Sequence, residues 1–365
     1  MGKFSFGHIF FLICAVSIAS LKTYPQLFMA LSGRDSWICS IIAFAIIVIY
    51  FDYIIQIYIK NDYCSIGQIF ETAFGKYLGK FFLSIFTFEV IVSLIESMSV
   101  ESNVIHTNFF LESPVWYVAL FVVIPGFYVV KNGAYSIMVV LMGSMAMSTI
   151  NGINLAMLTA PFKDYRRLFP VFENGLYANF FISIVKIIGM YSSIAIVIPC
   201  LSKLNKNKNA RKYALISNLF IAQMILISTI GLLATFDVKR GNNIIYPKLI
   251  QTQLISFFGF IADGEFYVIF QLISSWFAKY VTAFFAVIIL FKELNLNEKF
   301  LNKKTEAVLS IIIYVISCFV GREVIYLFKI LDIYIYMNVV VFFILPIVTF
   351  TLFNIKNKKN INTLQ

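Results

Sequence analysis

Long apolar runs, separated only by short polar stretches, constrain this chain more than any other feature of its sequence. Of its 365 residues, 60% are hydrophobic and only 13% are charged, about half the charged fraction of soluble domains. The runs do not alternate apolar and polar residues, as the strands of a transmembrane β-barrel would. The sequence therefore predicts an all-α integral membrane protein and excludes a water-soluble multidomain enzyme.

The number of runs predicts the architecture. A bilayer core about 30 Å thick is crossed by about 20 apolar residues in a helix. Ten helices in two sets of five predict halves of opposite orientation, an inverted repeat common in secondary transporters. On this basis residues 1–365 form a single transmembrane domain with ten spans, at 5–31, 36–59, 81–105, 115–131, 134–160, 178–201, 213–236, 266–291, 306–321 and 333–355.

Basic residues predict the orientation. With both termini cytoplasmic, the inner segments hold 17 Lys and Arg and the outer segments hold 9, the bias expected for a multi-pass protein of the cell membrane. The net charge of +11 then reflects loops beside an anionic lipid bilayer. No recognition motif accompanies it, so we expect no nucleic-acid partner. In the long outer loop 237–265, apolar spacing over 247–260 predicts a helix lying on the outer face, with a solvated loop as the alternative.

Six charged residues inside the predicted spans are the candidates for buried polar groups, where each costs about 2.5–3.5 kcal/mol at a helix centre. They should therefore face one another or water. Counting residues from the outer end of each span at 1.5 Å per residue places three of them about 12–13 Å deep and a fourth about 20 Å deep. The three are Lys22, Glu96 and Lys186, and the fourth is Lys279. These four predict a network that either lines a ligand cavity or is a fixed internal ion-pair cluster. For the other two, Asp52 and Glu89, we expect contacts to the inner interface or to neighbouring helices.

Spans one and six hold equivalent places in the two halves, and each contains a point where a helix can unwind. In span one, Pro25 removes a helix hydrogen bond after small residues; in span six, Gly189 precedes two serines. Paired interruptions of this kind are the sequence signal of a binding site near the membrane midplane, although Pro kinks and packing glycines give the same pattern. The candidate ligand-binding residues are Ala19, Ser20, Lys22, Thr23, Ser93, Glu96, Lys186, Gly189, Met190 and Lys279.

Neither catalytic nor metal-binding motifs are found in the sequence. It contains two histidines and five scattered cysteines, without the ligand spacing of a metal site. We therefore expect no enzymatic activity, no cofactor and no metal.

Four stretches resemble the spore germinant-receptor B subunits, a family within the amino acid–polyamine–organocation transporter superfamily. They are the segment from Pro247 through Trp276 and Lys279, the segment GRDSWICSII at 33–42, the loop FKDYRRLFPVFENG at 162–175, and GKYLGK at 75–80. The resemblance covers nearly the whole chain, and the order of these stretches makes it specific. The junction at 262–265 lacks an Arg that relatives often carry.

The resemblance implies a leucine-transporter-like five-plus-five fold with broken helices one and six. It also implies nutrient sensing, often of amino acids, in complex with A- and C-type receptor subunits in the inner membrane of a bacterial spore. We expect a small nutrient between spans one, three, six and eight, with Lys279 as a tethered cation in place of sodium. The alternatives are a proton-coupled amino-acid transporter, with Glu96 or Lys279 carrying the proton, and a scaffold without a ligand.

Overall fold

The computed structural model describes residues 4–5, 7–62, 64–173, 175–205, 209–237, 244–257, 261–262, 264–294 and 303–362. Side chains at 21–22, 256–257, 261–262, 303 and 358–362 lie outside this description. The α-helices are α1 His8–Ile18, α2 Ser20–Thr23, α3 Pro25–Ser32, α4 Ser36–Lys60, α5 Ile66–Phe74, α6 Lys76–Asn108, α7 Val115–Lys131, α8 Ala134–Leu158, α9 Ala178–Tyr191, α10 Ile198–Leu201, α11 Ala210–Thr235, α13 Pro247–Gln253, α14 Glu265–Glu293, α15 Lys303–Val320, α16 Val324–Asn338 and α17 Leu345–Asn362.

Shorter elements connect or interrupt these helices. Helices predominate because, in a hydrocarbon environment, only a helix or a closed barrel satisfies every backbone hydrogen-bonding group. Gly75 separates α5 from α6 at φ +86°, a conformation that glycine adopts without strain. The 3₁₀ turns are η1 Gly33–Asp35, η2 Ala160–Phe162, η3 Tyr165–Leu168 and η4 Ser192–Val197; η6 Val339–Ile344 is π-helical, and β1 Ser256–Phe257 pairs with β2 Ile261–Ala262.

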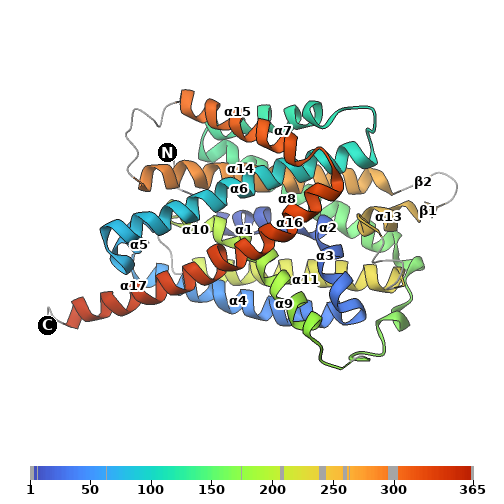
Figure 1. The fold of residues 1–365 in the computed structure, drawn as a ribbon, viewed down its shortest axis with the longest axis horizontal. Coiled ribbons are helices and arrows are strands. Elements are labelled where there is room, and N and C mark those ends of the chain that lie inside the picture. The colour runs from blue at the N-terminus through green and yellow to red at the C-terminus, as the bar shows by residue number, and fades with distance from the viewer. Residues whose placement is uncertain are drawn as a thin grey trace.

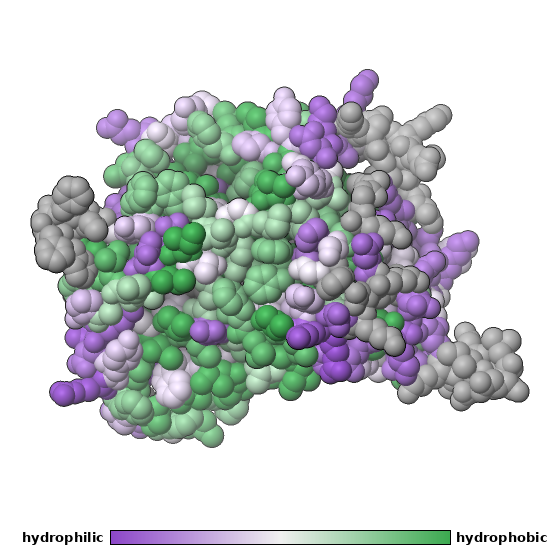
Figure 2. All heavy atoms as spheres, turned by 180° about the vertical axis from the view of Figure 1, so that it is seen from behind, coloured by the Kyte–Doolittle hydropathy of each residue, from purple (hydrophilic) through white to green (hydrophobic). Residues whose placement is uncertain are grey.

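Length and apolarity identify the membrane-spanning part of the structure. In the described residues, seven helical segments are long and apolar enough to cross a membrane: Pro25–Lys60, Lys76–Asn108, Ala134–Leu158, Ala178–Leu201, Ala210–Thr235, Glu265–Glu293 and Val324–Asn357. Figure 2 shows a broad hydrophobic surface between hydrophilic ends, the pattern of a protein surrounded by lipid. The prediction of a multi-pass membrane protein is confirmed, whereas the count of ten spans and the inverted repeat stay predictions.

The helices run roughly along one direction, with two of them side by side through the middle (Figure 1). These are α6 and α14, and α8 packs on α14 as well. Helices α7 and α15 form one edge of the bundle, and α4 and α11 pack together toward the opposite edge. Both chain termini lie toward one end, while α13 and the β1–β2 hairpin lie at the other. The centre is therefore built from α6, α14 and the interrupted segments that pack on them.

The predicted outer helix over 247–260 is wrong at residues 254–257, and residues 258–260 lie outside the described part of the chain. Helix α13 ends at Gln253, and a hairpin follows with Ser256 opposite Ala262. The carbonyl oxygen of Thr252 accepts hydrogen bonds from the N–H groups of Ile255 (3.2 Å) and Gly264 (2.9 Å). A carbonyl satisfied from across the hairpin no longer needs the next helical turn, so the chain turns back.

The last predicted span begins too late. Residues 322–332 were expected to lie in an outer loop, but α16 begins at Val324 and continues through η6 into α17. Leu327, Leu331 and Ile335 are buried at helical spacing along its first turns. The helix therefore carries charged residues that a loop would leave in water.

Candidate functional site

Span one is interrupted twice near its middle. Helix α1 ends at Ile18, Ala19 forms a turn before the short α2, and α3 starts at Pro25. Ser20 and Thr23 are buried in this interruption, and their hydroxyl groups have no hydrogen-bond partner among the described residues. Two unpartnered hydroxyls at a helix break are polar groups available to a ligand.

Span six is interrupted by a 3₁₀ stretch. Helix α9 ends at Tyr191, six residues of η4 follow, and α10 completes the segment. The Ser192 hydroxyl donates to the carbonyl oxygens of Gly189 (2.8 Å) and Asn338 (3.2 Å), which ties the break to α16. A Cβ on Gly189 would lie 2.3 Å from the Ile335 carbonyl oxygen. Gly189 therefore allows close packing of α9 on α16, and Met190 is buried beside it.

A buried ion pair joins α6 to α14 at the centre of the bundle. The Lys279 Nζ lies 2.6 Å from Oε2 of Glu96 and donates to its Oε1 at 2.9 Å. The two side chains are only 1% and 3% exposed. The Tyr24 hydroxyl, at the interruption of span one, donates to Oε1 of Glu96 at 2.5 Å. Ammonium and hydroxyl together compensate the carboxylate for the loss of water, and they connect spans one, three and eight.

Aromatic and hydroxyl groups enclose this pair. The Lys279 Nζ lies 5.1 Å from the ring centre of Trp276 and 5.9 Å from that of Tyr334, within reach of cation–π attraction. The hydroxyls of Tyr334 and Ser93 lie 2.6 Å apart. Ser93 is thus held by α16 rather than exposed to a cavity.

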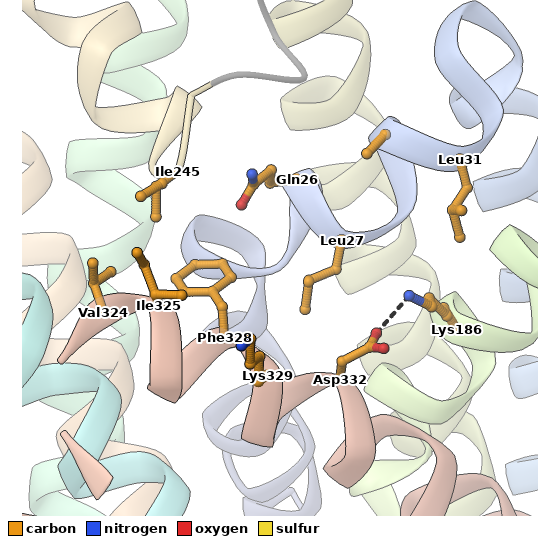
Figure 3. A pocket seen from close by; sticks show the side chains of 11 residues that line it. Gln26, Leu27, Leu31, Lys186, Ile245, Val324, Ile325, Phe328, Lys329 and Asp332 are labelled. Carbon is orange, nitrogen blue, oxygen red and sulfur yellow. Dashed lines mark hydrogen bonds and ion pairs between the residues drawn. The ribbon is translucent and has the colours of Figure 1, made fainter.

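Lys186 forms a second ion pair, in a pocket on the other side of α16. Its Nζ donates to Oδ1 of Asp332 at 2.5 Å, with the two side chains 11% and 39% exposed. The pocket has a volume of about 500 Å³ and lies between α3, α9, α16 and Ile245. In Figure 3, Gln26 and Leu27 of α3 point into the space beside this pair. The Lys186 ammonium and the Asp332 carboxylate therefore both border this pocket.

Helix α16 separates the two ion pairs. Asp332 and Tyr336, one turn apart, face Lys186, whose Nζ lies 5.8 Å from the Tyr336 ring centre. Tyr334, on another face of the same helix, contacts the ammonium of Lys279. A side chain two residues along a helix is rotated by about 200°, so one helix contacts both pairs.

The expected single network of four charges is therefore wrong for the side chains that the structure describes. Glu96 and Lys279 form one pair, and Lys186 pairs with Asp332 instead. Lys22 lies in α2, and its side chain is outside the described residues. A similar predicted depth in the spans therefore does not give these charges a shared partner.

Sequence reasoning missed three residues of these clusters. The predicted spans leave Asp332 in a loop, and the predicted site includes neither Tyr24 nor Tyr334. The apolar spacing of Leu327 and Leu331 with the predicted last span extends the helix backward and would have placed Asp332 on it. No sequence signal shows which way the two tyrosine hydroxyls point.

Three other carboxylates within the spans, those of Asp52, Glu89 and Glu101, lie outside these two ion pairs. Arg211 of α11 holds Asp52 of α4 through two hydrogen bonds, of 2.8 and 2.9 Å, the interhelical contact expected for that carboxylate. Glu89 and Glu101 of α6 are 1% and 3% exposed. Within the described part of the chain, both Glu89 oxygens and Oε2 of Glu101 have no hydrogen-bond partner. Glu101, inside the predicted third span, was overlooked in the count of buried charges.

Comparison with known proteins identifies the family. A family model described as "Spore germination protein" matches residues 3–325. The chain belongs to this spore permease family. The match includes both interrupted spans and the Glu96–Lys279 pair, and it ends before Asp332 and Tyr334. No curated protein matches the sequence.

The fold is similar to that of a solved membrane transporter. A sodium-coupled sialic acid symporter, in a substrate-bound outward-open state, matches with a TM-score of 0.64 and 10% sequence identity, over 91% of this chain and 75% of that one. The family resemblance seen in the sequence is confirmed, and the helical fold is of the membrane transporter type.

Proposed function

We propose that this spore germination protein senses a small nutrient, an amino acid, and signals to A- and C-type receptor subunits rather than transporting the nutrient. The observation that carries this proposal is the Lys186–Asp332 pair in the pocket of Figure 3. An amino acid carries a carboxylate and an ammonium. The lysine would bind the first and the aspartate the second, so a ligand exchanges one ion pair for two.

The pocket is lined by residues of α3, the first turns of α16 and Ile245, which belong to the side of the chain that the basic-residue bias assigns to the outside. We propose that both termini are cytoplasmic, in the inner membrane of a spore, and that the nutrient arrives from the opposite side. Gln26 and Leu27 of α3 line the pocket two and three residues after Tyr24. A ligand that draws α3 toward α9 and α16 would therefore pull on the Tyr24–Glu96 hydrogen bond.

This connection suggests how binding becomes a signal. The unpartnered hydroxyls of Ser20 and Thr23 lie at the same interruption, and with Ala19 they would line the space that opens when Tyr24 moves. Binding shifts an equilibrium only when it favours one of two arrangements. Here the favoured arrangement would change the Tyr24–Glu96 hydrogen bond, which joins the start of α3 to α6, and partner subunits would respond to that change.

A germination assay tests the binding site. Spores carrying this chain as their only B-type subunit are exposed to each of the standard amino acids, and half-maximal concentrations are measured. We expect Lys186→Gln and Asp332→Asn each to raise the effective concentration about 10-fold or more, since a hydrogen bond to a charged group contributes about 1.5–3 kcal/mol. Arg34→Gln, which removes an exposed outer-surface pair with Glu173, is the control. Unchanged nutrient sensitivity in both pocket variants would overturn the proposal.

Ion-coupled transport is the second candidate function, favoured by the fold shared with a sodium-coupled symporter and by the buried carboxylates of Glu89 and Glu96 on one face of α6. In liposomes, accumulation of an amino acid under a pH gradient would establish transport, with Glu96 or Lys279 as the proton carrier. Binding without accumulation supports the sensor.

A further inference from the structure

A second pocket lies between α8, α11, α13 and α14, away from both ion pairs. Its volume is about 210 Å³, and its lining combines cationic, polar and apolar groups. The lining residues that could contact a ligand include Lys163, Lys248, Gln271, Ser228, Ile153 and Ile227. The proposed nutrient site makes no use of any of them.

Two lysines enter this pocket from the connecting segments. Lys248 of α13 is only 8% exposed, and its Nζ donates to Oε1 of Gln251 at 2.8 Å. The amide nitrogen of Gln251 is itself bonded to the Gly231 carbonyl oxygen (2.9 Å) and to the Thr235 hydroxyl (2.6 Å). That arrangement fixes the position of the ammonium. Lys163 donates to the Ala156 carbonyl oxygen at 3.1 Å, in the last turn of α8.

Among the described residues, neither ammonium group has an acidic partner. The pocket lining contains neither Asp nor Glu, and no ion pair within the described residues includes Lys163 or Lys248. Burial and, to a smaller degree, the nearby positive charge of Lys163 together lower the pKa of Lys248 to about 7. Burial lowers the pKa of Lys163 as well. A buried cation without a partner is unfavourable, so an anion placed between the two would be strongly attracted.

Two further polar groups in the pocket are unsatisfied. Gln271 donates through its nitrogen to the Ser148 carbonyl oxygen at 3.0 Å, which leaves its oxygen without a partner. The Ser228 hydroxyl is also buried without one among the described residues. A Cβ on Gly152 would lie 3.1 Å from the Gln271 nitrogen, so this glycine keeps the space open. An acceptor such as the Gln271 oxygen requires a ligand that also carries hydrogen-bond donors.

The remaining wall of the pocket reaches the lipid-facing surface. Ile153 of α8 is 56% exposed and Ile227 of α11 is 49% exposed. They belong to apolar rows that include Ile150 and Met157 on α8, both more than half exposed. A ligand held by the lysines could therefore continue as hydrocarbon along these rows without leaving the membrane.

We propose that this pocket binds the headgroup of an anionic phospholipid whose headgroup carries hydroxyl groups, of the phosphatidylglycerol type. The phosphate lies between Lys163 and Lys248, the headgroup hydroxyls donate to Gln271 and Ser228, and the acyl chains follow Ile153 and Ile227. The bound lipid holds α13 against α8 and α11.

Thermal unfolding of the purified, delipidated chain tests this proposal. Phosphatidylglycerol should raise the unfolding temperature, while phosphatidylcholine and water-soluble glycerol phosphate should not. Lys248→Met should raise the half-saturating lipid concentration about 10-fold or more. The variant removes an unpaired buried ammonium but also the donor to Oε1 of Gln251, so its lipid-free unfolding is measured as well. A cooperative unfolding transition there distinguishes lost binding from misfolding. Lys131→Gln, which removes a charge at the end of α7, is the matched control.

Three outcomes would overturn the proposal. One is an equal stabilisation by phosphatidylcholine, which would show that any lipid suffices. Another is an equal stabilisation by glycerol phosphate, which would mean that the site takes a free anion. The third is an unchanged phosphatidylglycerol effect when Lys163→Gln and Lys248→Met are combined.

Discussion

The Glu96–Lys279 pair gives the sharpest test of how the centre of the bundle is stabilised. Lys279→Met keeps the length of the side chain and removes its charge. The Glu96 carboxylate, 3% exposed, would then have only the Tyr24 hydroxyl as a described hydrogen-bond donor. Breaking a buried pair by removing one partner costs about 3–5 kcal/mol. We therefore expect the unfolding temperature to fall by roughly 5–15 °C, given a few degrees per kcal/mol for a chain of this size.

The double variant decides whether the loss comes from the unpaired charge. Glu96→Gln combined with Lys279→Met removes both charges and leaves an amide oxygen for Tyr24. We expect most of the lost stability to return, with a coupling free energy of about 2 kcal/mol or more between the two sites. The measurement is thermal unfolding of the four proteins of this cycle in one detergent. If the double variant is as unstable as the sum of the single variants, the two charges do not stabilise each other.

Three further predictions concern packing, hydrogen bonding and ions. Gly189→Ala places a Cβ 2.3 Å from the Ile335 carbonyl oxygen and should cost about 1–3 kcal/mol of unfolding free energy; Gly143→Ala, where nothing lies within 4 Å, should leave thermal stability equal or slightly higher. Tyr24→Phe should cost about 1.5–3 kcal/mol by the same unfolding assay, because Glu96 loses a charge-assisted hydrogen bond. Nutrient binding, followed with labelled amino acids, should be equal in sodium and choline chloride, because a buried ammonium already provides the cation; a sodium requirement would contradict this.

Sequence alone located Lys186 of the proposed site but not its partner, Asp332. Lys186 was expected near Glu96 because the two lie at similar depths in their spans. Depth follows from the position of a residue in its helix, at about 1.5 Å per residue. The partner depends on how each helix is rotated and on which neighbour it packs against. With α16 between them, Lys186 meets Asp332 and Glu96 meets Lys279.

The end of α13 gives a second example. Apolar residues at helical spacing favoured a helix to residue 260, and nothing local opposed it. The helix ends at Gln253 because the Gly264 N–H, from beyond the hairpin, bonds to the Thr252 carbonyl oxygen. A hydrogen bond from that far along the chain has no signature in the local pattern.

What the sequence determined was everything that follows from the cost of leaving water: a membrane protein, helices where apolar runs are long, and interruptions where Pro25 or the Gly189 segment weakens the backbone ladder. These are local consequences of composition and spacing. Only the tertiary structure decided the pairing of the buried charges, the enclosure of Ser93 by Tyr334, and the closeness of two lysines at the pocket beside α8. Those results depend on distances between helices remote in sequence, which are set by the packing of all their faces at once.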